Sequence, residues 1–146
     1  MVLLPFNELG DLPTGVHKAS FSEVIARFGA GSKQREAVTA RLRRIHDLAI
    51  ATGALDRLII FGSYVTNKLE PKDVDVILIM RDDFRSETCP PETLVLFDHR
   101  RAAAELEASI FWIRPALLLI ETLDEFILRW QIKREGGTRG IVEVKP

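Results

Sequence analysis

Two short apolar runs, separated by a polar passage, constrain the fold of this chain more than any other feature. Residues 58–61 read Leu-Ile-Ile-Phe, and residues 76–79 read Val-Ile-Leu-Ile. Apolar runs of this length between turn-forming residues are typical of buried β-strands. Helical patterns precede and follow the pair, so we predict an α/β fold with a mixed central sheet flanked by helices.

Two carboxylates introduce the second apolar run. Asp73 and Asp75 lie two residues apart, and side chains at this spacing on a strand project to the same face. Two like charges beside an apolar strand repel each other, and burial increases the cost. A bound divalent cation removes the repulsion, and carboxylate oxygens suit Mg²⁺. The pair therefore predicts a magnesium site.

The first apolar run ends at a feature that suits a phosphate. Gly62 allows a backbone or a phosphate to approach closely. Ser63 offers a hydroxyl and a backbone N–H at the start of a short helix predicted over residues 64–68, and a helix start favours anions. Taken alone, Gly-Ser is a common turn and Asp-x-Asp is a common strand cap. Together they predict a phosphate seat and a metal seat at the ends of two neighbouring strands.

These residues resemble the signature of a known superfamily. Phe61-Gly62-Ser63, nine intervening residues and Asp73-Val74-Asp75-Val76 are similar, in order and spacing, to the motif of the DNA polymerase beta-like nucleotidyltransferases, and most of all to their small stand-alone members. The resemblance implies that Gly62 and Ser63 hold the β- and γ-phosphates of an NTP such as ATP. It also implies that Asp73 and Asp75 are catalytic ligands of Mg²⁺, and that the NMP passes to a hydroxyl acceptor.

The resemblance also bears on partners. Acceptors in similar proteins include tRNA ends and hydroxyl-bearing side chains of a partner protein, and some of these proteins act within toxin–antitoxin pairs. A second resemblance, to a small prokaryotic group of unassigned function, covers most of the chain. It is carried by Leu12-Pro13-Thr14-Gly15-Val16-His17 and by Trp130-Gln131-Ile132-Lys133-Arg134, and it implies no chemistry by itself.

The chain departs from the superfamily pattern on the strand predicted over residues 108–114. A third carboxylate usually projects from this strand, but residues 108–113 contain no acid. Ser109 occupies the expected position, and Glu107 lies just outside it. A second hypothesis is therefore a catalytically degenerate nucleotidyltransferase fold that binds a nucleotide or a partner protein without turnover.

The whole-chain composition sets the remaining limits. A length of 146 residues is that of one ordinary domain, and the single cysteine, Cys89, excludes an internal disulfide and the usual zinc clusters. No apolar run is long enough for a membrane span, and no secretory signal is recognisable. We expect a cytoplasmic protein. Residues 1–19, rich in proline and glycine, are predicted to be an extended arm that lies on the domain or on a partner. A second copy of the chain is one such partner. Residues 20–146 form the domain.

The other elements follow from apolar spacing and helix caps. Further strands are predicted over residues 108–114 and 140–145. Helices are predicted over residues 20–29, 32–52, 91–107 and 122–136, and residues 117–120 fit either a strand or a helix start. The inward-facing residues of the third helix are expected to be Leu94, Phe97, Ala104 and Leu106. Trp130 is expected to be a core anchor rather than a base-stacking platform.

Basic residues gather at two places. The helix over residues 32–52 carries Lys33, Arg35, Arg41, Arg43 and Arg44. These form either a solvated helix face or a basic ridge beside the active cleft, able to hold nucleotide phosphates or an RNA backbone. Lys133, Arg134 and Arg139 form a second basic spot. An RNA-binding module that uses residues 41–44 is the weakest hypothesis, because a net charge of −1 provides no general attraction to nucleic acid.

Overall fold

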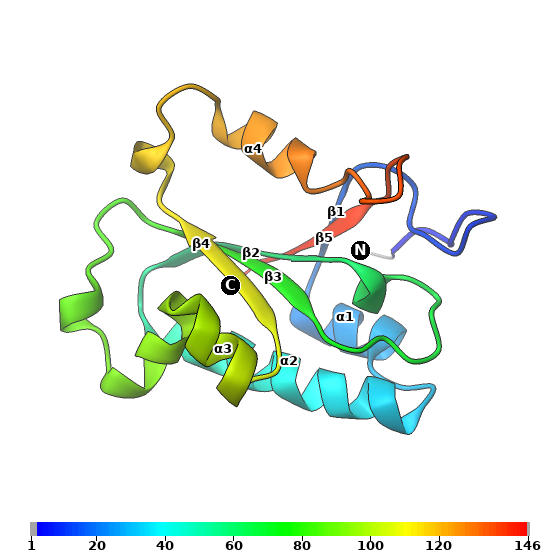
Figure 1. Ribbon diagram of the computed structural model, residues 1–146, viewed down its shortest axis with the longest axis horizontal. Coiled ribbons are helices and arrows are strands. Elements are labelled where there is room, and N and C mark those ends of the chain that lie inside the picture. Colours follow the sequence, from blue (N-terminus) through cyan, green and yellow to red (C-terminus); the bar gives the residue numbers. More distant parts are fainter. Residues whose placement is uncertain (1–2, 146) are drawn as a thin grey trace.

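The computed structural model describes residues 3–145 and confirms the α/β prediction (Figure 1). The described residues form a five-stranded mixed sheet of order β1-β5-β2-β3-β4. Its strands are β1 (Val16–Ala19), β2 (Leu55–Phe61), β3 (Asp75–Met80), β4 (Ser109–Ile113) and β5 (Ile141–Val144). The α-helices are α1 (Phe21–Phe28), α2 (Lys33–Ala51), α3 (His99–Glu105) and α4 (Leu123–Arg129). Short 3-10 helices are η1 (Ser63–Val65), η2 (Ser86–Thr88), η3 (Pro91–Phe97) and η4 (Pro115–Leu117).

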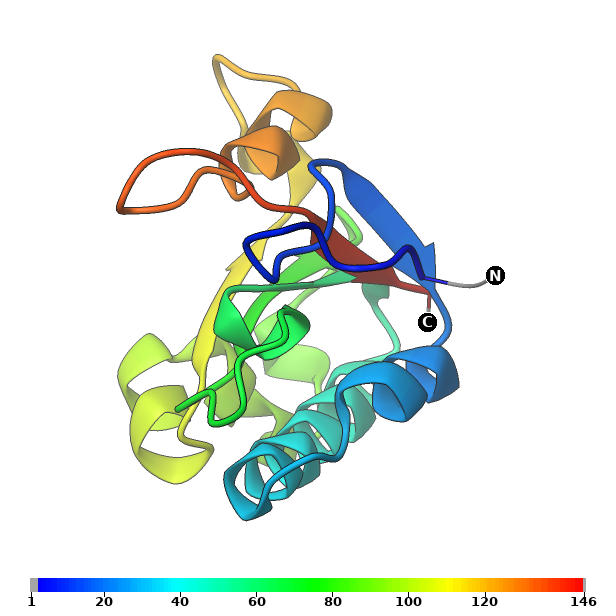
Figure 2. The ribbon, with the colours of Figure 1, turned by 90° about the vertical axis from the view of Figure 1, so that its right-hand side faces the viewer.

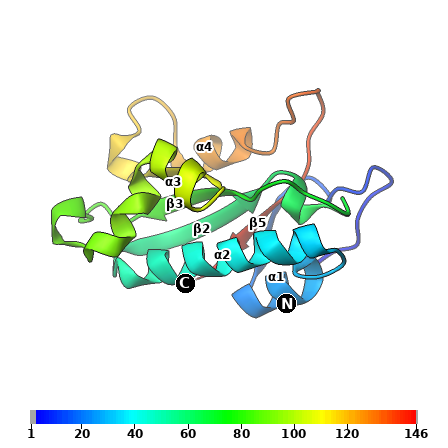
Figure 3. The ribbon, with the colours of Figure 1, turned by 60° about the horizontal axis from the view of Figure 1, so that its bottom comes forward.

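The sheet lies between two unequal layers of helices. Helices α1, α2 and α3 cover one face, and α4 lies over the other (Figures 1 and 3). Side chains alternate between the two cores along each strand. In β3, Val76 and Leu78 join the core on the side of α2, whereas Ile77 and Ile79 pack with Ile127 of α4. Asp75 has the parity of Ile77, so its side chain belongs to the α4 face.

Strand pairing brings the ends of three strands together. The antiparallel pairing of β2 with β3 places Phe61 opposite Asp75. The parallel pairing of β3 with β4 places Ser109 beside Asp75. Three residues therefore meet at one end of the central strands. They are Gly62, which follows β2, Asp75, which opens β3, and Ser109, which opens β4.

The N-terminal segment is more closely integrated than an arm. It is extended, as predicted, but residues 16–19 form β1, which pairs in parallel with β5. Leu3 and Leu12 are buried in the core beneath the sheet. Val2, expected to lie on the domain or on a partner, falls outside the described residues.

The helix predicted over residues 91–107 is wrong as a single element. Asp98 has an extended backbone, and its side chain caps α3 by accepting a hydrogen bond from the Arg101 N–H at 3.0 Å. The break shifts the helical phase. Ala102 is therefore buried, while Ala104, predicted to point inward, is exposed. Leu106 is buried as predicted.

The predictions for residues 117–136 also need correction. Residues 117–120 form neither a strand nor a helix beyond η4, and Leu119 and Ile120 are 93% and 100% exposed. Helix α4 begins with the predicted capping box at Thr122 but ends at Arg129, not near Gly136. Residues 130–140 are consequently a loop. None of the helices in the described range is long and apolar enough to cross a membrane.

Arg35 was predicted to lie on an exposed basic face, and this is wrong. Its side chain is buried and donates hydrogen bonds to carbonyl groups of two separate segments. The acceptors are Phe28 O at 3.1 Å, Tyr64 O at 2.7 Å, Thr66 O at 3.2 Å and Lys68 O. Of the helix predicted over residues 64–68, only η1 forms. The hydrogen bonds donated by Arg35, rather than a helix, therefore set the path of the chain after Ser63.

We predict that Arg35→Met lowers the free energy of unfolding by about 3 kcal/mol, because several buried carbonyl groups lose their charged donor. Urea denaturation measures the change. Arg44→Met on the exposed side of the same helix is the control, with an expected change within about 0.5 kcal/mol. Equal effects of the two substitutions would contradict this role of Arg35.

Candidate functional site

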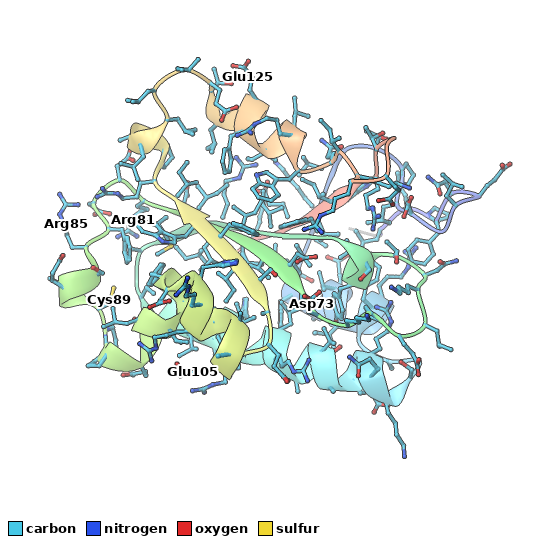
Figure 4. All side chains as sticks on the ribbon, in the orientation of Figure 1. Asp73, Arg81, Arg85, Cys89, Glu105 and Glu125 are labelled. Atoms are coloured by element: carbon cyan, nitrogen blue, oxygen red, sulfur yellow. The ribbon has the colours of Figure 1, made fainter. Side chains whose placement is uncertain are left out.

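A cleft of about 500 Å³ lies where the ends of β2, β3 and β4 face the loop after α4. The predicted phosphate residues, Gly62 and Ser63, and the predicted metal ligands, Asp73 and Asp75, all line it. The other lining residues are Phe61, Ser109, Phe111, Trp130, Ile132, Lys133, Arg134, Glu135 and Arg139. Figure 2 shows the loop of residues 130–140 over this edge of the sheet, and Figure 4 shows Asp73 at the start of β3.

Gly62 is in direct contact with the predicted metal site. Its φ of +78° is in the left-handed region, which favours glycine. A Cβ added at this position would overlap Oδ2 of Asp75 and would lie 3.1 Å from its Cγ. The turn at Gly62-Ser63 and the carboxylate of Asp75 are therefore packed against each other, well within the reach of one triphosphate.

The ionisation of Asp75 reflects its crowded surroundings. Burial, and then the neighbouring charge of Asp73, raise the pKa of Asp75 to about 6. A hydrogen bond donated by the Ser109 hydroxyl and the charges of Arg134 and Arg139 act in the opposite direction. The balance leaves a carboxylate whose negative charge is under-compensated. Such a group gains from a cation placed beside it.

The donor set fits Mg²⁺ with a small number of protein ligands. Among residues 3–145, no group of three or more His, Cys, Asp or Glu side chains is arranged to hold a metal ion. Asp75 opens β3 and Asp73 lies two residues before it, so the strand starts later than the predicted residue 73, but both residues line the cleft. Mg²⁺ commonly takes one or two carboxylates and completes its shell with water and substrate phosphates, so this pair is sufficient for a substrate-assisted site.

Ser109 lies on the strand where the superfamily resemblance predicts a third carboxylate. Ser109 is the register partner of Asp75 on β4, and its hydroxyl acts to lower the pKa of Asp75. Glu107 does not compensate, because it is an exposed residue that forms an ion pair with Arg41 of α2. Glu135 lines the cleft, but its carboxylate is already paired with a cation, since it lies 3.4 Å from Nη2 of Arg139.

The cationic wall of the cleft was only partly predicted. Lys133, Arg134 and Arg139 were recognised as a basic spot but were not connected with the carboxylates. The structure places all three in the lining of the cleft. In contrast, the cations of α2 do not line it, which favours the solvated-face interpretation for residues 33, 41, 43 and 44. The three loop cations line the cleft because α4 ends at Arg129 and residues 130–140 turn back over the ends of the strands.

One buried acid behind this wall was not predicted from the sequence. Asp11 is buried, and its Oδ2 lies 2.6 Å from Nζ of Lys133, while its Oδ1 lies 3.8 Å from Nε of Arg139. More than a hundred residues separate the partners along the chain, and no local pattern joins them. The only hint was its position immediately before the Leu12–His17 segment.

An aromatic wall completes the cleft. The Trp130 ring lies 4.8 Å from the Phe61 ring and 4.9 Å from the Phe111 ring, centroid to centroid. Trp130 is therefore a packing residue, as expected, and it also faces the cleft. Its indole Nε1 is buried and has no hydrogen-bond partner in the described part of the chain. One half of the cleft is thus polar and charged, and the other is aromatic.

We predict that Gly62→Ala lowers the free energy of unfolding by at least about 1 kcal/mol more than Gly53→Ala. Both glycines have a positive φ, but a Cβ at Gly53 meets nothing within 4 Å. The difference therefore isolates the overlap with Asp75. Chemical denaturation of both variants measures it, and equal losses would argue against close packing at Gly62.

We also predict that Asp75→Asn stabilises the metal-free protein at neutral pH. Because the pKa of Asp75 is higher in the folded protein than its ordinary 3.8, deprotonation costs stability, progressively from about pH 4 to about pH 6. Asparagine avoids this cost, so the gain reaches about 2 kcal/mol above pH 7 and vanishes near pH 4. Denaturation in a chelator at several pH values tests this, with the exposed Asp56→Asn as the control. A gain independent of pH would contradict it.

Comparison with known proteins places the chain in a family without assigning it a function. No curated protein and no solved structure matches the chain. A family model described as a family of unknown function, DUF6932, matches residues 4–145. The match includes both walls of the cleft and the N-terminal segment behind them. The chain therefore belongs to the DUF6932 family.

Proposed function

We propose that this protein is a small Mg²⁺-dependent nucleotidyltransferase that moves an NMP from an NTP to a hydroxyl acceptor. One observation carries the proposal. The Gly62-Ser63 turn packs against Asp75 in a cleft that also contains Asp73 and a wall of three cations. The resemblance of these residues to the nucleotidyltransferase signature supports the same conclusion.

Each group has a role in this proposal. Gly62 and Ser63 hold the β- and γ-phosphates, and Asp73 and Asp75 hold the metal. When bound there, Mg²⁺ would neutralise charge on the α-phosphate and on the leaving pyrophosphate. The acceptor oxygen forms a bond to the α-phosphorus while the bond between that phosphorus and the bridging oxygen of the β-phosphate breaks. Pyrophosphate leaves, and the acceptor proton passes to water.

The acceptor side is open in this proposal. A tRNA end or a hydroxyl-bearing side chain of a partner protein is compatible with the chemistry, in a cytoplasmic setting and within a toxin–antitoxin pair. The cleft volume of about 500 Å³ lies in the range of small-molecule sites. The aromatic wall provides a surface for the nucleobase, since base–aromatic stacking tolerates any base.

A second candidate function is favoured by Ser109. A neutral hydroxyl stands where a third carboxylate would polarise the acceptor hydroxyl, so turnover should suffer more than binding. In this alternative the fold binds a nucleotide or a partner protein without transferring anything. The intact Gly62-Ser63 and Asp73/Asp75 pairs favour transfer.

We predict that calorimetric titration with the four NTPs and Mg²⁺ detects metal-dependent binding that Asp73→Asn/Asp75→Asn abolishes. The matched control is Asp82→Asn/Asp83→Asn, which removes the same charge from an exposed loop. Pyrophosphate release in the presence of tRNA or of candidate partner proteins then distinguishes transfer from binding alone. Failure of every NTP to bind would contradict nucleotide transfer and nucleotide binding alike.

We further predict that Ser109→Asp, at saturating Mg²⁺ and NTP, raises the rate of pyrophosphate release by about 100-fold. A carboxylate at this position would lie beside Asp75, its register partner on β3, and would polarise the acceptor hydroxyl. Ser109→Ala controls for loss of the hydroxyl. An unchanged rate in Ser109→Asp would show that this position does not limit turnover.

A further inference from the structure

Two segments of the sequence were not among the predicted phosphate and metal residues, although they are the ones that resemble a group of unassigned function. They are the N-terminal segment around Leu12–His17 and the segment Trp130–Arg134. The structure brings them together (Figures 1 and 2). The Gly15 N–H donates to Oε1 of Gln131 at 2.6 Å, and the Gly140 N–H donates to the Leu12 carbonyl at 3.0 Å. The N-terminal segment is therefore the support of the loop that carries the cationic wall.

Asp11 is the charged contact within this support. Its side chain is 6% exposed, and those of its partners Lys133 and Arg139 are 11% and 19% exposed. Both cations line the cleft, whereas Asp11 does not. The carboxylate thus lies behind the wall, paired with two cations that line the cleft.

The backbone around Asp11 is paired with the segment that follows the Gly62-Ser63 turn. Asp11 forms an isolated β-bridge with Thr66, and the Asn67 N–H donates to the Gly10 carbonyl at 2.9 Å. These residues follow η1, which starts at Ser63. Asp11 therefore connects the Gly62-Ser63 turn with the cationic loop, and it fixes the spacing between the two parts that would grip a polyphosphate.

We propose that Asp11 is a positioning residue of the nucleotide site. It orients Lys133 and Arg139 so that their charges meet the β- and γ-phosphates opposite Gly62 and Ser63. The proposal rests on the proposed function for the identity of the ligand, but not for the ion pairs themselves. The chemical class it assigns to the cationic wall is a polyphosphate chain, which is the most highly charged part of an NTP.

Two effects of removing the Asp11 charge oppose each other. Loss of a carboxylate makes the cleft more positive, which attracts anions. It also frees two long cationic side chains, which then lose their rotamer freedom only on binding. Lys and Arg are among the side chains that lose the most rotamer freedom when they are ordered, and two of them would be freed here. Ordering of the cations therefore dominates, and binding weakens.

The test measures binding of inorganic tripolyphosphate with Mg²⁺ by calorimetry at 0.15 M salt. Asp11→Asn is expected to raise the Kd by about tenfold or more, and Asp56→Asn, with the same change in net charge, is expected to leave it unchanged. In a Lys133→Met background the effect of Asp11→Asn is expected to fall below about threefold, because the main partner is gone.

Two results would overturn the proposal. One is unchanged or tighter binding in folded Asp11→Asn. The other is an equal loss with and without Lys133, which would show that Asp11 only stabilises the fold. Should Asp11→Asn fail to fold, Lys133→Gln and Arg139→Gln, both at the cleft surface, replace it. Each is expected to raise the Kd about tenfold, and normal binding in both overturns the proposal.

The outcome is separable from that of the proposed function. Tripolyphosphate carries no base, no ribose and no transferable nucleotide. If it binds in the predicted manner while no NTP yields pyrophosphate with any acceptor, nucleotide transfer fails and the role of Asp11 stands. If NTPs bind and react while the Asp11 and Lys133 variants behave as wild type, the role of Asp11 fails and transfer stands.

Discussion

The antiparallel register of β2 with β3 is the constraint on which the candidate site depends. With Phe61 opposite Asp75, the chain leaving β2 at Gly62 has to pass directly over the Asp75 carboxylate. A shift of one residue would move Asp73 and Asp75 to the opposite face of the sheet, into the core under α2. Arg35 secures the arrangement from below, because it donates hydrogen bonds to the carbonyl groups of residues 64, 66 and 68.

The cleft contains both carboxylates and cations, and the two kinds of charge come from different segments of the chain. Two carboxylates at the start of β3 and three cations of the loop line the same cleft. Burial, and then the charge of Asp73, raise the pKa of Asp75 to about 6 despite these cations. This separation of carboxylates and cations suits a ligand that consists of a metal ion and phosphate groups. Holding charged groups apart in an open cleft costs stability, and the expected gain from Asp75→Asn is a measure of that cost.

Much of this arrangement was readable from local pattern. The apolar runs over residues 58–61 and 76–79 identified two central strands, and the capping boxes at Ser20 and Thr122 correctly marked helix starts. The predicted phosphate and metal residues lie in one cleft because strand ends adjoin when strands pair. The helix over residues 91–107 was misjudged, since propensity along the segment does not register the extended backbone at Asp98.

The sequence by itself determined the strands β2 to β5, the spacing of Asp73 and Asp75 and the absence of an acid at Ser109, because each is a property of neighbouring residues. Tertiary structure alone decided which cations face the carboxylates. Arg35 is buried beneath the sheet, while Lys133 and Arg139 line the cleft because α4 ends early and the loop after it turns back over the strand ends. Such pairings depend on contacts between residues far apart in the chain, and no local periodicity encodes them.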